Sequence, residues 1–288
     1  MPDSKDIIVD LYDIVACGDY YYNNAEFDNA MECYNRAIEL SPEKSELYRK
    51  RALMYMFLHK NDEALIDCSK ALEIERSAES YVYCALAYYY MEEYEKTITN
   101  YTKAIELSPN DSAYYYARGE CYWRLNDCVN AILDYTKAIN LNPNCSFYYF
   151  HARALVYAKM EQYENAIKDE SKAIELCPAN EVYYSLRAWY YLNLNKTKEA
   201  LDDINRCLND LGGVCADNYV LRAKIYTALN DYDNALLDYT SAIDYAFSIM
   251  DTNISVYYQL RGEFYQLIGN NELAEADFKK AEEHSINQ

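Results

Sequence analysis

A pattern of about 34 residues recurs through nearly the whole chain, and it restricts the possible folds more than any other feature of the sequence. In the copy at 112–143, Tyr115, Gly119 and Tyr122 lie at i, i+4 and i+7, which places them on one face of a helix. A second helix in the same copy repeats this spacing with Ala131, Tyr135 and Ala138. Two short amphipathic helices cannot bury both apolar faces alone, so each copy needs a neighbouring copy.

Eight copies can be aligned, and the sequence predicts one continuous array at 11–283 between a lead-in at 1–10 and a tail at 284–288. The predicted copies are 11–44, 45–77, 78–111, 112–146, 147–180, 181–215, 216–254 and 255–283. Every copy has Tyr at one slot of the first helix, with Gly or Ala three residues before it. A side chain no larger than methyl is needed where two helix backbones approach closely.

This pattern resembles the tetratricopeptide repeat family, whose repeat joins aromatic, small and Pro positions in the same order. The matching residues in one copy are Tyr115, Gly119, Tyr122, Ala131, Tyr135, Ala138 and Pro143. The resemblance covers about 11–283, and it implies an all-α fold, a helix-turn-helix solenoid wound as a right-handed superhelix. It also implies a concave groove that holds peptide segments of other proteins.

Six copies depart from the family pattern in the same way. An Arg stands just before the small residue of the first helix, and the same copies have an Asp in the second helix. The pairs are Arg51 with Asp67, Arg118 with Asp134, Arg153 with Asp169, Arg187 with Asp203, Arg222 with Asp238 and Arg261 with Asp277. The other two copies lack both residues, so we predict an ion pair within each of the six repeats. A ladder of arginines for phosphate binding is disfavoured, because each Arg is already neutralised by its Asp.

A second stripe on each first helix lies beside the core stripe, and the resemblance implies that this stripe lines the groove. Its predicted partner-binding residues in copies three to six are Leu86, Tyr89, Tyr116, Glu120, Trp123, Tyr148, His151, Leu155, Trp189 and Leu192. Large aromatic side chains beside apolar ones are typical of peptide-binding hot spots. The alternative is that the stripe residues pack on each other and fill the groove. A partner peptide should be mostly apolar, with basic residues to meet Asp19, Glu46, Glu79 and Glu120.

Three irregularities interrupt the pattern. The last spacing has five extra residues, so either the helix through Ala242 continues toward Met250 or a loop bulges there. Gly212 and Gly213 replace the terminal Pro of the sixth copy. Glu170 occupies a slot that is aromatic in other copies, which predicts a carboxylate that is paired or partly solvated.

Composition narrows the classes of function. The formal net charge of -20 argues against a surface for nucleic acid or anionic membrane. The longest apolar run, 81–91, is too short for a membrane helix, and 1–10 does not read as a secretory signal, so we predict a cytoplasmic protein. Ten cysteines are scattered without a CxxC pair, and the three histidines have no HExxH motif, so no metal or cofactor is predicted.

The predicted function is that of a non-enzymatic scaffold or adaptor, favoured as a monomer, that binds a protein or peptide partner in the groove. One alternative is a chaperone-type adaptor that clamps a C-terminal tail, although Asp19, Glu46 and Glu79 would repel the tail's carboxylate. The others are a self-assembling structural module and an enzyme with a composite site between repeats.

Overall fold

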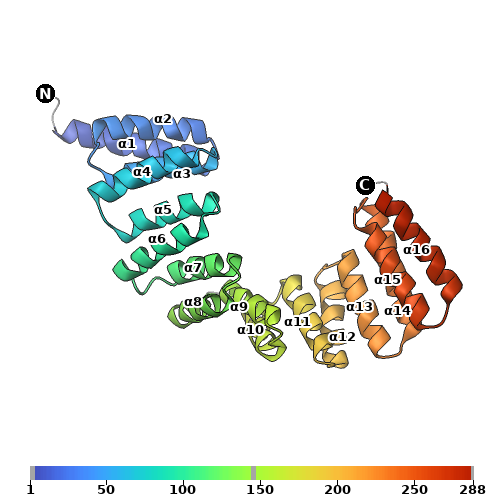
Figure 1. Cartoon of the computed structure of the whole chain (residues 1–288). Coiled ribbons are helices and arrows are strands. Elements are labelled where there is room, and N and C mark those ends of the chain that lie inside the picture. The colour runs from blue at the N-terminus through green and yellow to red at the C-terminus, as the bar shows by residue number, and fades with distance from the viewer. Residues whose placement is uncertain (1–3, 144–146, 287–288) are drawn as a thin grey trace. The chain divides into compact units, whose positions relative to one another are not determined.

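The chain folds into consecutive antiparallel pairs of helices, as Figure 1 shows. The structure is a computed structural model that describes residues 4–143 and 147–286. These two ranges contain sixteen α-helices and one short π-helical turn, and no strand. The all-α prediction is therefore confirmed, and each helix pair is one repeat.

The contacts divide the chain into two compact units, 1–143 and 144–288, each described here by itself. The first unit contains α1 (Ser4–Asn23), α2 (Phe27–Leu40), α3 (Ser45–Phe57), α4 (Asn61–Ile74), α5 (Ala78–Tyr90), α6 (Tyr94–Leu107), α7 (Ser112–Arg124) and α8 (Cys128–Leu141). The second contains α9 (Phe147–Lys159), α10 (Tyr163–Leu176), α11 (Glu181–Asn193), α12 (Thr197–Asn205), α13 (Ala216–Ala228), α14 (Tyr232–Ser248), α15 (Ile254–Leu267) and α16 (Asn271–Ile286). Continuity of the stack between the fourth and fifth repeats stays a prediction.

Within each unit a helix packs chiefly against the other helix of its pair and then against the next repeat. From the second to the seventh repeat, the first helix begins at the residue where the aligned copy begins, and in the eighth it begins one residue earlier. The first helix starts at Ser4, so it includes most of the segment set apart as a lead-in. The last helix continues to Ile286, into the predicted tail.

The turn inside each repeat is a Schellman motif, and its main-chain acceptor is the carbonyl of the Tyr that all eight copies share. In the fourth repeat the N–H of Asp127 donates to the carbonyl of Tyr122 at 2.8 Å, across Asn126 in the left-handed region. Such a turn satisfies carbonyls that the helix end leaves without an intrahelical partner. The other seven turns make the same bond to Tyr21, Tyr55, Tyr88, Tyr157, Tyr191, Tyr226 and Tyr265.

The small residue of the first helix lies against the second helix of the same repeat. A Cβ on Gly119 would lie 2.8 Å from Cε1 of Tyr135, closer than carbon atoms normally approach. The alanines of this column in other repeats, such as Ala52 and Ala188, are fully buried. Tyr135 is fully buried too, so the close approach lets a large ring fill the layer between the two helices.

The sixth and seventh repeats, whose sequences are irregular, end in different local structures. After α12 a π-helical turn at Arg206–Asp210 leads into Gly212 and Gly213. A Cβ on Gly213 would lie 2.4 Å from Sγ of the buried Cys207, so only glycine fits there. In the seventh repeat α14 is 17 residues long and ends at Ser248, which confirms that the helix through Ala242 continues.

Candidate partner-binding surface

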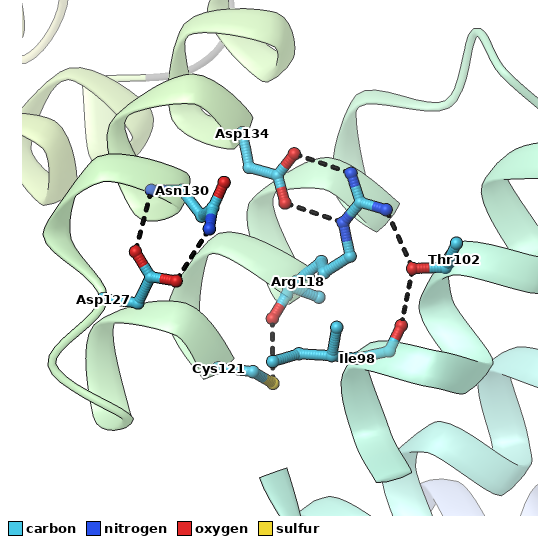
Figure 2. Close-up of polar contacts among 8 residues, drawn as sticks. Ile98, Thr102, Arg118, Cys121, Asp127, Asn130 and Asp134 are labelled. Atoms are coloured by element: carbon cyan, nitrogen blue, oxygen red, sulfur yellow. Dashed lines mark hydrogen bonds and ion pairs between the residues drawn. The ribbon is translucent and has the colours of Figure 1, made fainter. Parts of the chain in front are cut away.

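Six ion pairs of one geometry hold the first and second helices together within their repeats. In the fourth repeat Arg118 Nε donates to Asp134 Oδ2 at 2.7 Å and Nη2 donates to Oδ1 at 2.8 Å, as Figure 2 shows. This bidentate arrangement is the strongest geometry for an Arg–carboxylate pair. The same two bonds form at Arg51–Asp67, Arg153–Asp169, Arg187–Asp203, Arg222–Asp238 and Arg261–Asp277.

Each of five arginines also reaches the preceding repeat, which the sequence reasoning missed. Arg118 Nη1 donates to Thr102 Oγ1 on α6 at 2.9 Å, so one side chain joins three helices (Figure 2). The corresponding acceptors of Arg51, Arg187, Arg222 and Arg261 are Asn35, Ser171, Asn205 and Thr240. All of them lie two residues after the Asp column, a slot that is Asn, Ser or Thr in the first seven copies. This recurring Asn, Ser or Thr was the sequence signal from which the bonds between repeats could have been predicted.

The arginines are therefore part of the frame and do not present a charged surface. Their side chains are 13 to 19% exposed, and those of their Asp partners 3 to 10%. Aromatic rings cover the guanidinium as well: in the second repeat the rings of Tyr48 and Tyr55 lie 5.8 and 5.9 Å from Arg51 Cζ. At this separation cation–π attraction adds to the ion pair.

In the first unit a stripe of half-buried side chains lies on α5 and α7, of which only α7 has an arginine of the frame. Leu86 packs partly on the core of the second and third repeats. The ring of Tyr89 lies edge-on to that of Tyr94, with centroids 5.8 Å apart. The ring of Tyr116 lies 5.7 Å from that of Tyr135, and Trp123, two turns further along α7, is half-buried.

Glu120 is the acidic member of this stripe, and its carboxylate accepts a short hydrogen bond from the hydroxyl of Tyr135. Burial and then the adjacent Glu120 charge raise the pKa of Tyr135, so the hydroxyl stays protonated and neutral. The hydrogen-bond partner of Glu120 is therefore a neutral hydroxyl and not a cation. A carboxylate in such a setting suits a cationic group of a ligand.

In the second unit the stripe on α9 and α11 is partly exposed and partly built into the core. Tyr148 is 39% exposed and Trp189 is 40% exposed. The indole of Trp189 lies edge-on to Tyr163, with centroids 5.7 Å apart and ring planes at 90°. Leu155 is half-buried, and Leu192 packs against the core of the sixth repeat.

His151 was predicted to contact a partner. In the structure its imidazole contacts Glu170, and its side chain is 23% exposed. His151 Nδ1 lies 2.8 Å from Oε1 of Glu170, whose side chain is fully buried on α10. Burial raises the pKa of Glu170, and the bond to His151 opposes that rise. Glu170 Oε2 has no hydrogen-bond partner within the described part of the chain. The carboxylate in the aromatic slot is therefore paired, but on one oxygen only.

Two hollows of the inner surface lie over the first three repeats of the first unit. One, of about 340 Å³, is lined by residues of α1 and α3, including Val15, Asp19 and Glu46. The other, of about 240 Å³, lies over α3 and α5, and its lining has both acids, Glu46 and Glu79, and bases, Arg49 and Lys50. Asp19 is not free to meet a partner's basic residue, because Lys50 Nζ lies 2.6 Å and the Tyr34 hydroxyl 2.7 Å from Oδ1. Glu46 lies 3.7 Å from the same lysine.

The part of the chain that the structure describes has neither a cluster of metal ligands nor a membrane-spanning helix. No group of three or more His, Cys, Asp or Glu side chains there is placed to hold a metal ion. None of the described helices combines the length and apolar character that crossing a bilayer requires.

Comparisons with known proteins agree with the helix-pair geometry. The family described as "Tetratricopeptide repeat" matches residues 16–44, 112–145, 147–180, 216–248 and 256–283, and the family described as "TPR repeat" matches 85–126. Protein STIP1 homolog of Dictyostelium discoideum is 34% identical over 58 residues, which are 20% of this chain and 10% of that protein. The chain therefore spans only a small part of that relative.

Solved structures of tetratricopeptide repeat proteins share the fold at low identity. The C-terminal part of a TPR repeat-containing protein from Cytophaga hutchinsonii is 19% identical with a TM-score of 0.68, and the match covers 79% of this chain and 93% of that one. YrrB, described as "a TPR protein with an unusual peptide-binding site", is 19% identical with a TM-score of 0.53, covering 72% of this chain and 97% of YrrB.

Proposed function

We propose that this chain, which belongs to the tetratricopeptide repeat family, is a non-enzymatic scaffold or adaptor that binds a peptide segment of a partner protein. The binding residues are those of the first-helix stripe on α5, α7, α9 and α11. The observation that supports this most is the partial exposure of Trp123, Tyr148 and Trp189, which lie on helices that an Arg–Asp ion pair fixes to the second helix of the same repeat. Rigid aromatic side chains bind with little loss of conformational entropy.

The comparisons support the class of partner. YrrB, which has the same fold, has a peptide-binding site by its own description. No catalytic family matches the chain among those reported above. Several of the ten cysteines occupy small or apolar packing slots of the repeat, such as Cys68, Cys84 and Cys207, which supports reduced thiols and a reducing compartment such as the cytoplasm.

The charges suggest where a basic residue of the peptide would lie. Glu120 has a neutral hydroxyl as its hydrogen-bond partner, whereas Asp19 is paired with the cation of Lys50. We therefore expect the peptide's Lys or Arg opposite Glu120, between apolar residues that contact Tyr116 and Trp123. The hollow over α3 and α5 does not single out a free C-terminal carboxylate, because its lining has two acids, Glu46 and Glu79, as well as Arg49 and Lys50.

The test is a selection from a displayed peptide library on the full chain, followed by fluorescence anisotropy with a selected peptide. Trp123→Ala and Trp189→Ala should each weaken binding about ten-fold or more, the range of a hot-spot residue. The matched controls are Leu133→Ala and Leu237→Ala, at apolar positions of second helices that are 61 and 63% exposed. Equal affinities for the stripe variants and wild type would contradict the proposal.

Glu120→Gln adds a readout of charge. This substitution should lower the affinity for a peptide that contains Lys or Arg. It should leave unchanged the affinity for the same peptide with that residue replaced by norleucine. Amidated and free-acid forms of the peptide should bind alike. A strong preference for the free acid would favour the tail-clamping adaptor instead.

A further inference from the structure

The connection between α14 and α15 differs from every other inter-repeat connection described. α14 has 17 residues, whereas α2, α4, α6, α8 and α10 have 14 each. The added residues place three large apolar side chains in water: Phe247 is 69% exposed, Ile249 56% and Met250 91%. We call these three residues the 247–250 patch. Contiguous exposed apolar side chains of this size are typical of interaction sites.

A hollow of about 330 Å³ lies beside the patch. Its lining includes Ala246, Phe247, Met250, Asp251, Ile254 and His284. A second hollow of about 470 Å³ starts at the next residues of the same helices, Ser255 and Ser285, and includes Val256, Phe278 and Glu282. The first hollow is formed mainly by the end of α14 and the connection to α15, and the second by α15 and α16, so the two are neighbours within the second unit.

Stability of the fold does not require this apolar surface. The N–H of Asp251 donates to the carbonyl of Ala246 at 2.9 Å, which ends α14 with Met250 at a φ of 54°. Gly or Asn suits this left-handed position better than Met. At 91% exposure the Met250 side chain gains little from packing inside the chain.

The charge around the hollows indicates what could cover them. Their linings contain the acids Asp251 and Glu282 and no Lys or Arg. The whole chain has a formal net charge of -20, so a second copy or an anionic membrane would be repelled. A segment with an apolar face and basic flanks is complementary to both the patch and the charge.

We propose that the 247–250 patch and the two hollows form a second docking surface, which binds a basic amphipathic helix of a partner protein. Apolar side chains of that helix would enter the hollows, and its Lys or Arg residues would meet Asp251 and Glu282. Binding of an amphipathic helix by its apolar face is a recurrent mode of recognition. The surface is separate from the first-helix stripe, so it does not depend on the function proposed above.

The probe is a fluorescein-labelled 18-residue peptide of Leu and Lys, with Leu at helical spacing, titrated with the full chain. In the patch variant, Phe247, Ile249 and Met250 are each replaced by Ser. The matched control replaces Ile66, Leu133 and Leu237 by Ser, because these side chains are 61 to 69% exposed on second helices. The patch variant should bind about ten-fold more weakly or worse, and the control within about two-fold of wild type. Equal helical circular dichroism confirms that all three proteins are folded.

Two peptides test the chemistry of the occupant. A peptide with the same Leu stripe and Glu in place of Lys should not bind, and neither should a Leu/Lys peptide without the stripe. The double variant Trp123→Ala, Trp189→Ala should bind the striped peptide like wild type. Any one of three results would overturn the proposal: an unchanged patch variant, equal binding of the unstriped peptide, or dimerisation of the free chain that the patch variant abolishes.

Discussion

Single arginines do most to fix the spacing of helices in this chain. Arg118 bonds to Asp134 on one side and Thr102 on the other, so changing one residue affects three helices. Asp134 is only 8% exposed, and removing its partner would leave a buried charge without compensation. We expect Arg118→Met to lower the free energy of unfolding by about 3 kcal/mol, measured by urea titration with circular dichroism.

The matched control is Lys103→Met, which breaks the pair between Lys103 and Glu106 on α6. These side chains are 49 and 56% exposed, so the loss should be below about 0.5 kcal/mol. The double variant Arg118→Met, Asp134→Leu should regain much of the stability, because no unpaired charge remains. A loss for Arg118→Met as small as the control's would mean that the pair is only a surface contact.

Glu170 should make stability depend on pH. Burial raises its pKa in the folded state, although His151 opposes the rise, and Asp169 and Arg187 add smaller opposite effects. A raised folded-state pKa stabilises the fold fully below the unfolded pKa, and this contribution is lost as pH rises through the folded value. Glu170→Gln should therefore gain stability relative to wild type between about pH 4 and pH 7.

Thermal melts across this pH range measure the difference in melting temperature between wild type and variant. The titration of all the groups that the two proteins share cancels in this difference. Glu175→Gln, on the exposed face of the same helix, is the control. A difference for Glu170→Gln that does not change with pH would show that the buried carboxylate is not the group responsible.

At the scale of elements, substitutions in the turns inside the repeats can raise the stability of the fold. Glu92 and Glu161 have φ values of 60° and 59°, a conformation that costs a non-glycine residue about 1 kcal/mol or more. Glu92→Gly and Glu161→Gly should each raise the free energy of unfolding by about that amount. The converse change, Gly269→Ala, at a φ of 81°, should lower it. A lower free energy of unfolding for both glycine variants would contradict the left-handed conformation of Glu92 and Glu161.

Helix boundaries could be predicted from the sequence because Tyr, small and Pro positions recur at fixed offsets within each repeat. The Arg–Asp pairs were predictable for the same reason, since both partners lie in one copy and are lost together. Bonds between repeats, such as Arg51 to Asn35, lie in a column that has three different residue types. The hollows and the exposure of Trp189 depend on how many side chains pack together, which no single column of the repeat describes.

At the scale of the whole molecule, the two outermost repeats differ at the positions of the arginine clamp. The first repeat has Cys17 in place of the Arg, and Cys17 is exposed. The eighth has Lys279 at the slot where preceding repeats offer Asn, Ser or Thr to the next Arg. The third repeat stacks on the second without a clamp, because Cys84 replaces its Arg, so a missing clamp alone does not prevent stacking. Two copies with a net charge of -20 each would repel one another as well, so we expect a monomer by sedimentation velocity at about 10 to 100 µM. Concentration-dependent growth would contradict this.

A repeat array is stabilised mainly by contacts between neighbours, so a piece that ends between repeats should fold. The fragment 1–143 keeps four complete helix pairs and the bonds of Arg51 and Arg118. We expect it to unfold cooperatively in urea, with the helical circular dichroism per residue of the full chain. The fragment 1–126 lacks α8, which leaves Arg118 without Asp134 and removes the Tyr135 ring beside Gly119. It should be less stable by several kcal/mol, since it exposes a core face and breaks a buried pair together. Equal urea midpoints of unfolding for the two fragments would show that α8 contributes little to the stability of the first unit.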